Sequence, residues 1–171
     1  MTSTSSVRLA GGMDPRDGWT AERCPMAAAF DQVRTRSAFL ILREALYGTT
    51  RFGDFATRVG ISEPVAAERL KELVADGLLV QEDYREPGQR ARKSYVLTEK
   101  GAELAPVLVA LKDWGDRWVY GGEGPVELRH AGCGAKVHVE VRCEDGHEIP
   151  DAGALELHPG PGARRSVRRS A

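Results

Sequence analysis

Three glycines, Gly48, Gly60 and Gly77, divide the middle of the chain into short segments in which apolar residues recur every three or four positions. This spacing is typical of amphipathic helices, and glycine readily adopts the left-handed backbone that commonly ends a helix. Helices are therefore expected over residues 39–47, 51–59 and 63–76. Because only a few residues around Gly60 separate the second and third, these two are predicted to form a pair joined by a tight turn.

A further helix is expected on either side of this set. Pro25 suits the first position of a helix over residues 25–33, with Cys24 as its N-cap. Thr98 is predicted to cap a long final helix. Pro106 has no N–H group to donate to the carbonyl of Ala102, so a bend or a distorted turn is expected within that helix.

Two apolar runs, at residues 78–80 and 95–97, predict strands separated by a segment in which Pro87 and Gly88 favour a turn. A β-hairpin is the simplest interpretation. The order of helix, helix, helix-turn-helix, hairpin and helix predicts a mainly α fold with a small β-hairpin wing, which is a winged helix-turn-helix. Weak alternation beyond Gly121 predicts a small C-terminal β appendage.

The expected organisation is one folded domain between two tails. Residues 1–22 and 151–171 are rich in small and polar residues without a core pattern, so both are expected to be flexible, and the second is basic. Residues 23–121 are expected to form the winged helix-turn-helix and dimerisation domain. Residues 122–150 are expected to form the β appendage.

The composition is that of a globular protein, with 42% hydrophobic and 29% charged residues among 171. No stretch approaches the roughly 18 apolar residues of a transmembrane helix, and the first residues lack the apolar core of a signal peptide, so we expect a cytoplasmic protein with no membrane partner. Three cysteines, an odd number, favour reduced thiols. The net charge of −1 means that any nucleic-acid binding must rest on how the charges are distributed.

The second helix of the predicted pair has the size and position of a helix that enters the major groove of duplex DNA. Its groove-facing residues are those left when the apolar stripe is removed. They are Ser62, Glu63, Pro64, Ala67, Glu68, Arg69 and Lys71. Arg69 and Lys71 can contact phosphate or guanine, and a glutamate on this helix can accept a hydrogen bond from cytosine.

The predicted wing is locally basic. Its cations are Arg85, Arg90, Arg92 and Lys93, against Glu86 alone. Such a turn suits contact with the phosphate backbone, and Arg90, Arg92 and Lys93 are taken as candidate DNA-binding residues.

Other interpretations remain open. An Arg-rich turn can be no more than a solvated loop, and winged helices also serve as protein-binding modules, for which the acidic Glu63 and Glu68 are suitable. The sequence contains no phosphate loop, nucleophile elbow, His-Glu-x-x-His or cofactor fingerprint, so it is not expected to be an enzyme or to require a cofactor.

Several short motifs occur together within residues 24–120. They are Cys24-Pro25-Met26, Leu40-Ile41-Leu42-Arg43-Glu44, Arg51-Phe52-Gly53-Asp54-Phe55, Ile61-Ser62, Arg69-Leu70-Lys71-Glu72-Leu73, Asp76-Gly77-Leu78, and Tyr95-Val96-Leu97-Thr98 with Gly101. In this combination the chain resembles the HxlR family. The resemblance implies a bacterial transcription regulator, repressor or activator, that forms a homodimer through its first and last helices and binds a roughly palindromic duplex DNA operator.

The chain departs from the family pattern at two places. The family usually has Gly-Gly-Lys-Trp where this chain has Arg34-Thr35-Arg36-Ser37, which removes an aromatic packing residue. Pro64 and Ala67 stand where Lys and Ser are commoner, so the operator sequence cannot be transferred from relatives. The oxidant or small molecule to which such a regulator responds is not disclosed by the sequence.

Cys24 is a candidate redox sensor. The positive end of a helix favours the thiolate, which is the form that reacts with oxidants. The resemblance to the HxlR family adds that several of its members use a cysteine at this place as a switch. The alternative is that Cys24 is a small apolar residue or a plain helix cap.

The predicted appendage contains a candidate metal site formed by His130, Cys133, Cys143 and His147. Two thiols and two imidazoles are a ligand set that zinc prefers, and the two pairs were expected to face each other across one hairpin. In similar C-terminal extensions the second pair is more often Cys-x-x-Cys, whereas here Gly146 holds the last position. The alternatives are free surface thiols or a disulfide that closes the hairpin.

Overall fold

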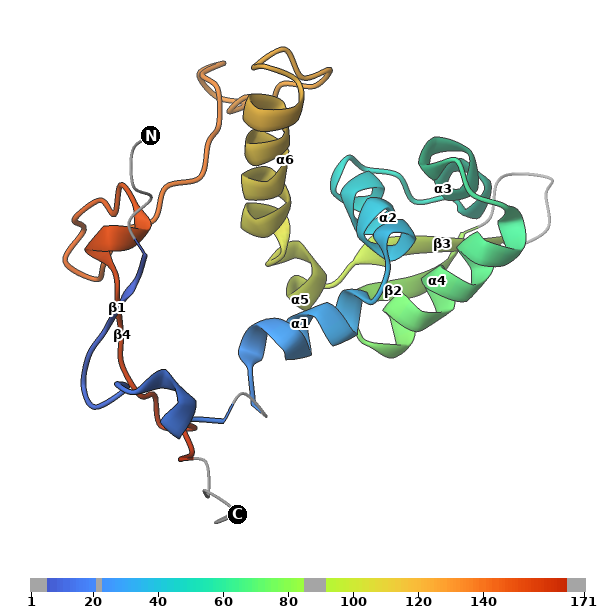
Figure 1. Ribbon diagram of the computed structural model, residues 1–171. Coiled ribbons are helices and arrows are strands. Elements are labelled where there is room, and N and C mark those ends of the chain that lie inside the picture. Colours follow the sequence, from blue (N-terminus) through green and yellow to red (C-terminus); the bar gives the residue numbers. More distant parts are fainter. Residues whose placement is uncertain (1–5, 21–22, 85–91, 166–171) are drawn as a thin grey trace. The chain divides into compact units, whose positions relative to one another are not determined.

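The computed structural model of the protein describes residues 6–20, 23–84 and 92–165 (Figure 1). The chain forms two compact units, one made of residues 1–28 with 140–171 and the other of residues 29–139. Each unit is described below by itself.

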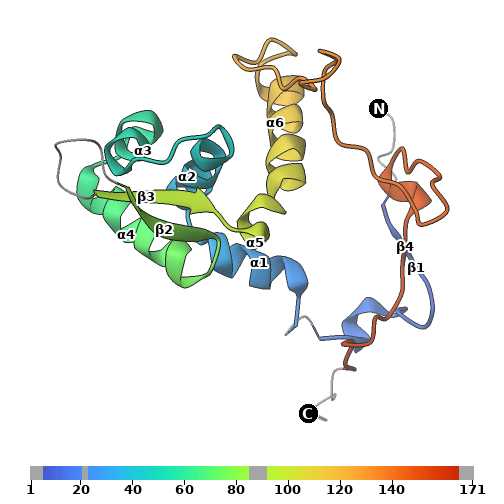
Figure 2. The same ribbon diagram turned by 180° about the vertical axis from the view of Figure 1, so that it is seen from behind.

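The larger unit contains the winged helix-turn-helix, so the predicted fold class is confirmed. Its helices are α1 (Pro25–Val33, which begins in the smaller unit), α2 (Arg36–Leu46), α3 (Phe52–Val59), α4 (Glu63–Ala75), α5 (Glu99–Ala102) and α6 (Ala105–Val119). Its strands are β2 (Leu79–Tyr84) and β3 (Arg92–Leu97). Figure 2 shows the β2–β3 hairpin from the side on which it lies in front of α2 and beside α4.

The core lies where α2, α3 and α4 pack on one another and on the hairpin. Its buried members are Ala38, Ile41, Leu42, Phe55, Leu70, Leu73, Leu78, Leu79 and Tyr95. The rings of Phe55 and Tyr95 meet edge to face at 84°, with their centroids 6.3 Å apart, which joins α3 to the wing. Helix α2 supplies Ala38, Ile41 and Leu42 and so lies at the centre of this core.

Backbone hydrogen bonds fix the turn between α3 and α4. The N–H groups of Gly60 and Ile61 both donate to the carbonyl of Ala56, at 3.0 and 3.1 Å, while Gly60 has a φ of +71°. This is a glycine-ended helix of the kind that the sequence predicted. The chain restarts at once with Ser62 as N-cap of α4 and with Pro64 in the first turn, where a missing N–H costs no hydrogen bond.

The wing is a six-pair antiparallel ladder that runs from Leu79 opposite Leu97 to Tyr84 opposite Arg92. The hairpin is thus observed as predicted. The loop that joins its strands, residues 85–91, lies outside the described residues, and with it lie Arg85, Arg90 and the predicted turn at Pro87-Gly88.

The final helix is interrupted near the place where a bend or a distorted turn was expected. The prediction was a single helix from Thr98, but the structure has a short α5, a turn over residues 103–104 and then a separate α6. Thr98 caps α5, where its Oγ1 accepts a hydrogen bond from the N–H of Gly101 at 3.0 Å. Pro106 lies in the first turn of α6, because a proline cannot donate to the carbonyl four residues earlier but fits the start of a new helix.

The β appendage also differs from its prediction. Residues 122–150 contain only two isolated bridges, Arg129 with Lys136 and Arg142 with Glu148, in place of one hairpin. Each bridge closes its own tight turn, and Gly134 and Gly146 supply the positive φ that such turns need. The first turn belongs to the larger unit and the second to the smaller one.

The smaller unit contains short elements at both ends of the chain. Strand β1 (Arg8–Leu9) pairs in parallel with β4 (Glu156–Leu157), and the 3₁₀ turns η1 (Arg16–Gly18) and η2 (Ala152–Ala154) lie nearby in sequence. The composition of these segments predicted flexible tails and gave no sign of the pairing, because two-residue strands leave no hydrophobic pattern. Their flexibility stays a prediction.

Gly101 is a described glycine at which an added side chain would meet packed backbone. A Cβ there would overlap the carbonyl oxygen of Leu78, which accepts the N–H of Thr98 at 3.1 Å. We expect Gly101→Ala to lower the free energy of unfolding by about 1–3 kcal/mol, because packed backbone has to move aside. Chemical denaturation measures the difference.

The matched control is Gly53→Ala on α3, where an added Cβ meets nothing within 4 Å. This change should leave stability unchanged or raise it by up to about 1 kcal/mol, since alanine favours helix over glycine. Equal effects of the two substitutions would contradict the described packing at Gly101.

Candidate nucleic-acid interface

Helix α4 has a buried side and an exposed side. Ala66, Leu70 and Leu73 are buried against the core. The predicted groove-facing residues that lie exposed on the other side are Ser62, Glu63, Pro64, Ala67, Glu68 and Lys71. In the larger unit, the exposed side of α4 therefore carries six of the seven residues that the sequence assigned to a groove.

Arg69 is the seventh, and it is held within the protein. Its guanidinium contacts the carboxylate of Glu72 at 2.5 Å and that of Glu68 at 2.7 Å, and only 18% of its side chain is exposed. Binding a phosphate through Arg69 would require breaking these ion pairs. Within the part of α4 that the structure describes, Lys71 is the cation that makes no ion pair.

The wing is less basic than its sequence indicated. The register places Asp83 directly opposite Lys93, and their side chains form an ion pair of 2.7 Å. From the sequence, Glu86 was counted as the only acid of the wing. Asp83 is a second one, and its role follows from cross-strand pairing. Arg92 and Lys93 are both exposed at the start of β3, and Arg90 lies outside the described residues.

Arg51 is a basic residue that the sequence analysis did not assign to the interface. It precedes α3 as its N-cap, forms a bridge with Ser94 of the wing, and has its guanidinium 5.4 Å from the centre of the Tyr84 ring. The backbone of Thr50 is fixed to the wing as well, because its carbonyl accepts the N–H of Tyr95 at 2.8 Å. The sequence signal that could have assigned Arg51 to the interface was a charged residue directly before a short predicted helix, in a chain that also has a predicted hairpin.

Arg51, Arg92 and Lys93 line one cavity of about 520 Å³ between the start of α3 and the wing. Asp54 is the acid among its lining residues. The N-terminus of a helix adds partial positive charge and unpaired N–H groups to such a place. The arrangement can therefore hold an anionic group such as a backbone phosphate.

A buried polar network fixes the chain between α2 and α3. Glu44 is buried, and its carboxylate accepts hydrogen bonds from Arg43, at 2.7 and 3.1 Å, and from the hydroxyl of Thr49 at 3.3 Å. Arg58 of α3 donates to the same hydroxyl at 2.9 Å. Because each of these charges has a partner, the network holds the last turn of α3 at a defined place beside the end of α2.

A second network joins the end of α1 to the end of α4. Arg34 has the left-handed φ of +58°, and its side chain donates to the carbonyl of Asp31 at 2.8 Å and to the carboxylate of Asp76 at 3.0 Å. Lys100 donates to the backbone carbonyl of Asp76 and to the side chain of Gln32. Arg34 stands where the HxlR family usually has glycine, which adopts this backbone without strain. In this chain, the two side-chain hydrogen bonds of Arg34 offset the backbone strain of an arginine at this position.

Helix α1 buries none of its residues. The side chains of Met26 and Phe30 are 72% and 74% exposed. The N–H of Ala28 donates to the carbonyl of Cys24 at 3.1 Å, which places Cys24 at the N-cap position, and Cys24 is half-buried and unbonded to another cysteine. A nine-residue helix with no buried side chain is marginal alone in water.

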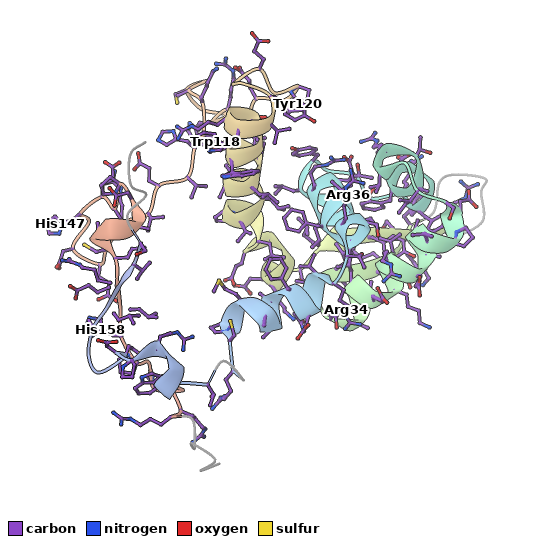
Figure 3. All side chains as sticks on the ribbon, in the orientation of Figure 1. Arg34, Arg36, Trp118, Tyr120, His147 and His158 are labelled. Carbon is purple, nitrogen blue, oxygen red and sulfur yellow. The ribbon has the colours of Figure 1, made fainter. Side chains whose placement is uncertain are left out.

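Helix α6 likewise exposes apolar side chains along one side. Val107, Leu111, Trp114 and Trp118 follow one another at spacings of four, three and four residues, and all are exposed. Figure 3 labels Trp118 and, just past the helix end, Tyr120. On the polar side of α6, Lys112 donates a hydrogen bond of 2.6 Å to the carboxylate of Asp116. This bond raises the pKa of Lys112.

The four predicted metal ligands lie in two pairs. His130 Nδ1 is 3.3 Å from Cys133 Sγ in the larger unit, and Cys143 Sγ is 3.4 Å from His147 Nδ1 in the smaller one (Figure 3 labels His147). All three cysteines are free thiols. A disulfide within the predicted appendage is therefore not formed.

Residues 33–122 match the HxlR-like helix-turn-helix family, so the chain belongs to that family. It is 36% identical over 143 residues to the HTH-type transcriptional regulator Rv3095 of Mycobacterium tuberculosis, covering 83% of this chain and 89% of the relative. The family and its relatives are transcription regulators rather than enzymes.

Two solved structures have a similar fold. The crystal structure of PA1607, a candidate transcription factor, has a TM-score of 0.69 and 32% identity, and the match covers 77% of this chain and 92% of the PA1607 chain. The redox regulator HypR in its reduced form has a TM-score of 0.50 and 27% identity, and the match covers 57% of this chain and 96% of HypR.

Among the described residues, no helix combines the length and apolar character needed to cross a bilayer.

Proposed function

We propose that this protein is a homodimeric transcription regulator of the bacterial cytoplasm that inserts α4 into the major groove of a roughly palindromic DNA site. The observation that carries the proposal is the division of α4 into a buried stripe and an exposed side. A helix held in this way by its inner residues presents its outer residues, from Ser62 to Lys71, as a rigid surface of the width that a major groove admits.

The neighbouring cations supply the contact with phosphate in this proposal. Lys71 lies on α4, Arg51 precedes α3, and Arg92 opens β3. Contacts of this kind set the position of a protein on DNA and its salt dependence, whereas base contacts set the sequence that it prefers. Ala67 and Pro64 offer apolar contact on the exposed side of α4, and Glu63 can accept a hydrogen bond from cytosine.

The proposal predicts that replacing Arg51, Lys71 and Arg92 with alanine together weakens binding to duplex DNA of any sequence by at least about tenfold at physiological salt. The slope of log affinity against log salt concentration should become shallower by about one for each phosphate contact that is lost. Fluorescence anisotropy over a salt series, with DNA selected from a random pool, measures both quantities.

Two control variants separate a local effect from a change in total charge. Arg129→Ala removes one exposed cation outside the interface and should bind DNA as the wild type does. Asp83→Asn removes the acid that pairs with Lys93 and should tighten binding. A triple variant with unchanged affinity and salt slope would favour a protein-binding winged helix, for which Glu63 and Glu68 are the candidate contacts.

The dimer is supported by the exposed apolar sides of α1 and α6. The spacing of four, three and four residues along α6 is the pattern by which helices pack in coiled coils. A cavity of about 550 Å³ lies between α2 and α6, so α6 does not close on the core of its own chain. A second copy would cover the aromatic stripe and supply the packing that these helices lack.

Replacing Leu111 and Trp118 with glutamate is expected to convert the dimer into a monomer, because two buried charges per chain would face each other across the interface. Light scattering coupled to size exclusion measures the mass. Val80→Glu, on an exposed valine of β2, is the matched control and should remain dimeric. A wild-type protein that is monomeric at micromolar concentration would contradict the dimer.

Redox control through Cys24 is the regulatory part of the proposal. The similar HypR is a redox regulator by its own description. In this chain, α1 carries Cys24 at its start, and the Arg34–Asp76 ion pair links its end to the end of α4. A change in α1 packing thus has a physical route to the DNA-reading helix.

Hydrogen peroxide would transfer one oxygen atom to the Cys24 sulfur, giving a sulfenic acid and water. We expect this oxidation to change the DNA affinity of the wild type by about fivefold or more, and that of Cys24→Ser by much less. Cys133→Ser should respond as the wild type does. Anisotropy before and after peroxide, with mass spectrometry of the thiols, makes the comparison, and an equal response of Cys24→Ser would refute a sensor at this position.

A further inference from the structure

The turn over residues 140–149 in the smaller unit gathers three different ligand groups. The Cys143 sulfur, a carboxylate oxygen of Asp145 and a ring nitrogen of His147 all lie within 4.8 Å of one another. All three residues are exposed, so a dissolved ion reaches them without a conformational change.

Backbone hydrogen bonds hold this turn in shape before any ion binds. Ile149 N–H donates to the carbonyl of Val141 at 2.8 Å, Cys143 N–H to that of His147 at 3.0 Å, and Gly146 N–H to that of Cys143 at 2.9 Å. Gly146 has a φ of +83°, a conformation that lets the chain reverse between the thiol and the imidazole.

The flanking Arg142 stiffens the turn further. Its guanidinium contacts the carboxylate of Glu140 at 2.5 Å and donates to the carbonyl of Gly146 at 3.1 Å. The ligand-bearing segment is therefore tied from both sides, and little entropy remains to be lost when an ion binds.

The distance between the two stronger ligands fits a tetrahedral zinc ion. Zinc–sulfur and zinc–nitrogen bonds of about 2.3 and 2.0 Å at a tetrahedral angle put the two ligand atoms about 3.5 Å apart. In the structure, Cys143 Sγ and His147 Nδ1 are 3.4 Å apart. A carboxylate oxygen of Asp145 lies within 4.8 Å of both atoms, and an exposed carboxylate can turn to reach the same ion.

The chemistry of the ligands selects the class of metal. Thiolate with imidazole favours zinc and similar transition metals, whereas calcium and magnesium take oxygen ligands throughout. A similar turn holds His130 and Cys133 at 3.3 Å, with Arg129 bound to Glu127 and to the carbonyl of Gly134. Within the described residues, only the turn at 140–149 adds a third ligand group.

We propose that Cys143, Asp145 and His147 form a zinc site, with water in the fourth position. Binding replaces the thiol proton of Cys143 by the metal and releases that proton to solvent. The ion cross-links the turn from Cys143 to His147. This site is independent of the proposed DNA contact.

Cobalt(II) substituted into the full-length protein tests the proposal, because a thiolate ligand gives cobalt a charge-transfer absorption that oxygen and nitrogen ligands do not give. The wild type, stripped of metal by a chelator, should show this band on cobalt addition and lose it on zinc addition. Cys143→Ser should lack the band, and His147→Ala and Asp145→Ala should weaken zinc binding by about tenfold or more.

Matched controls carry the same chemical changes elsewhere. Cys24→Ser removes a thiol, and His158→Ala removes an imidazole that pairs with Glu156; both variants should bind the metal as the wild type does. Circular dichroism checks that each variant is folded, which is expected because the altered side chains are exposed apart from the half-buried Cys24. A wild type without the band, or a Cys143→Ser variant that keeps it, would overturn the site.

Discussion

The burial of one side of α4 is the contact on which the rest of the structure depends. Ala66, Leu70 and Leu73 pack into the core formed with α2, α3 and the hairpin. A helix has 3.6 residues per turn, so fixing this stripe also fixes which side chains face away from it. The candidate DNA-reading surface is thus a consequence of core packing, and a cavity introduced beneath Leu70 would loosen the surface along with the fold.

Electrostatics then decides which residues of that surface can meet an anion. Acidic neighbours hold Arg69 and Lys93 in ion pairs, while Lys71 and Arg92 are exposed and Arg51 stacks near Tyr84. A chain with a net charge of −1 can therefore still place positive charge beside a DNA-reading helix, since Arg51, Arg92 and Lys93 line one cavity between α3 and the wing. The total charge says little about function here, and the few cations in that region should dominate the salt dependence of binding.

The sequence predicted the elements whose signals are local. Pro25 and the residues that follow marked α1 over its observed bounds, and Gly60 marked the turn of the helix pair. It did not predict what depends on distant parts of the chain. The Asp83–Lys93 pair needs the hairpin register, and the approach of Arg51 to Tyr84 needs the packed wing. The break before α6 was predicted as a bend or a distorted turn within one helix, since Pro106 can either kink a helix or begin one, and packing decides between them.

The most direct test of the central claim is photo-crosslinking to duplex DNA from two alanines of the same helix. Ala67 is exposed near the start of α4, and Ala75 is exposed at its end. With a benzophenone amino acid placed at either position, the account predicts cross-links to bases from position 67 and few from position 75. Cross-links from position 75 alone, or none from position 67 in a protein that still binds DNA, would show that α4 does not enter the groove by its exposed, N-terminal side.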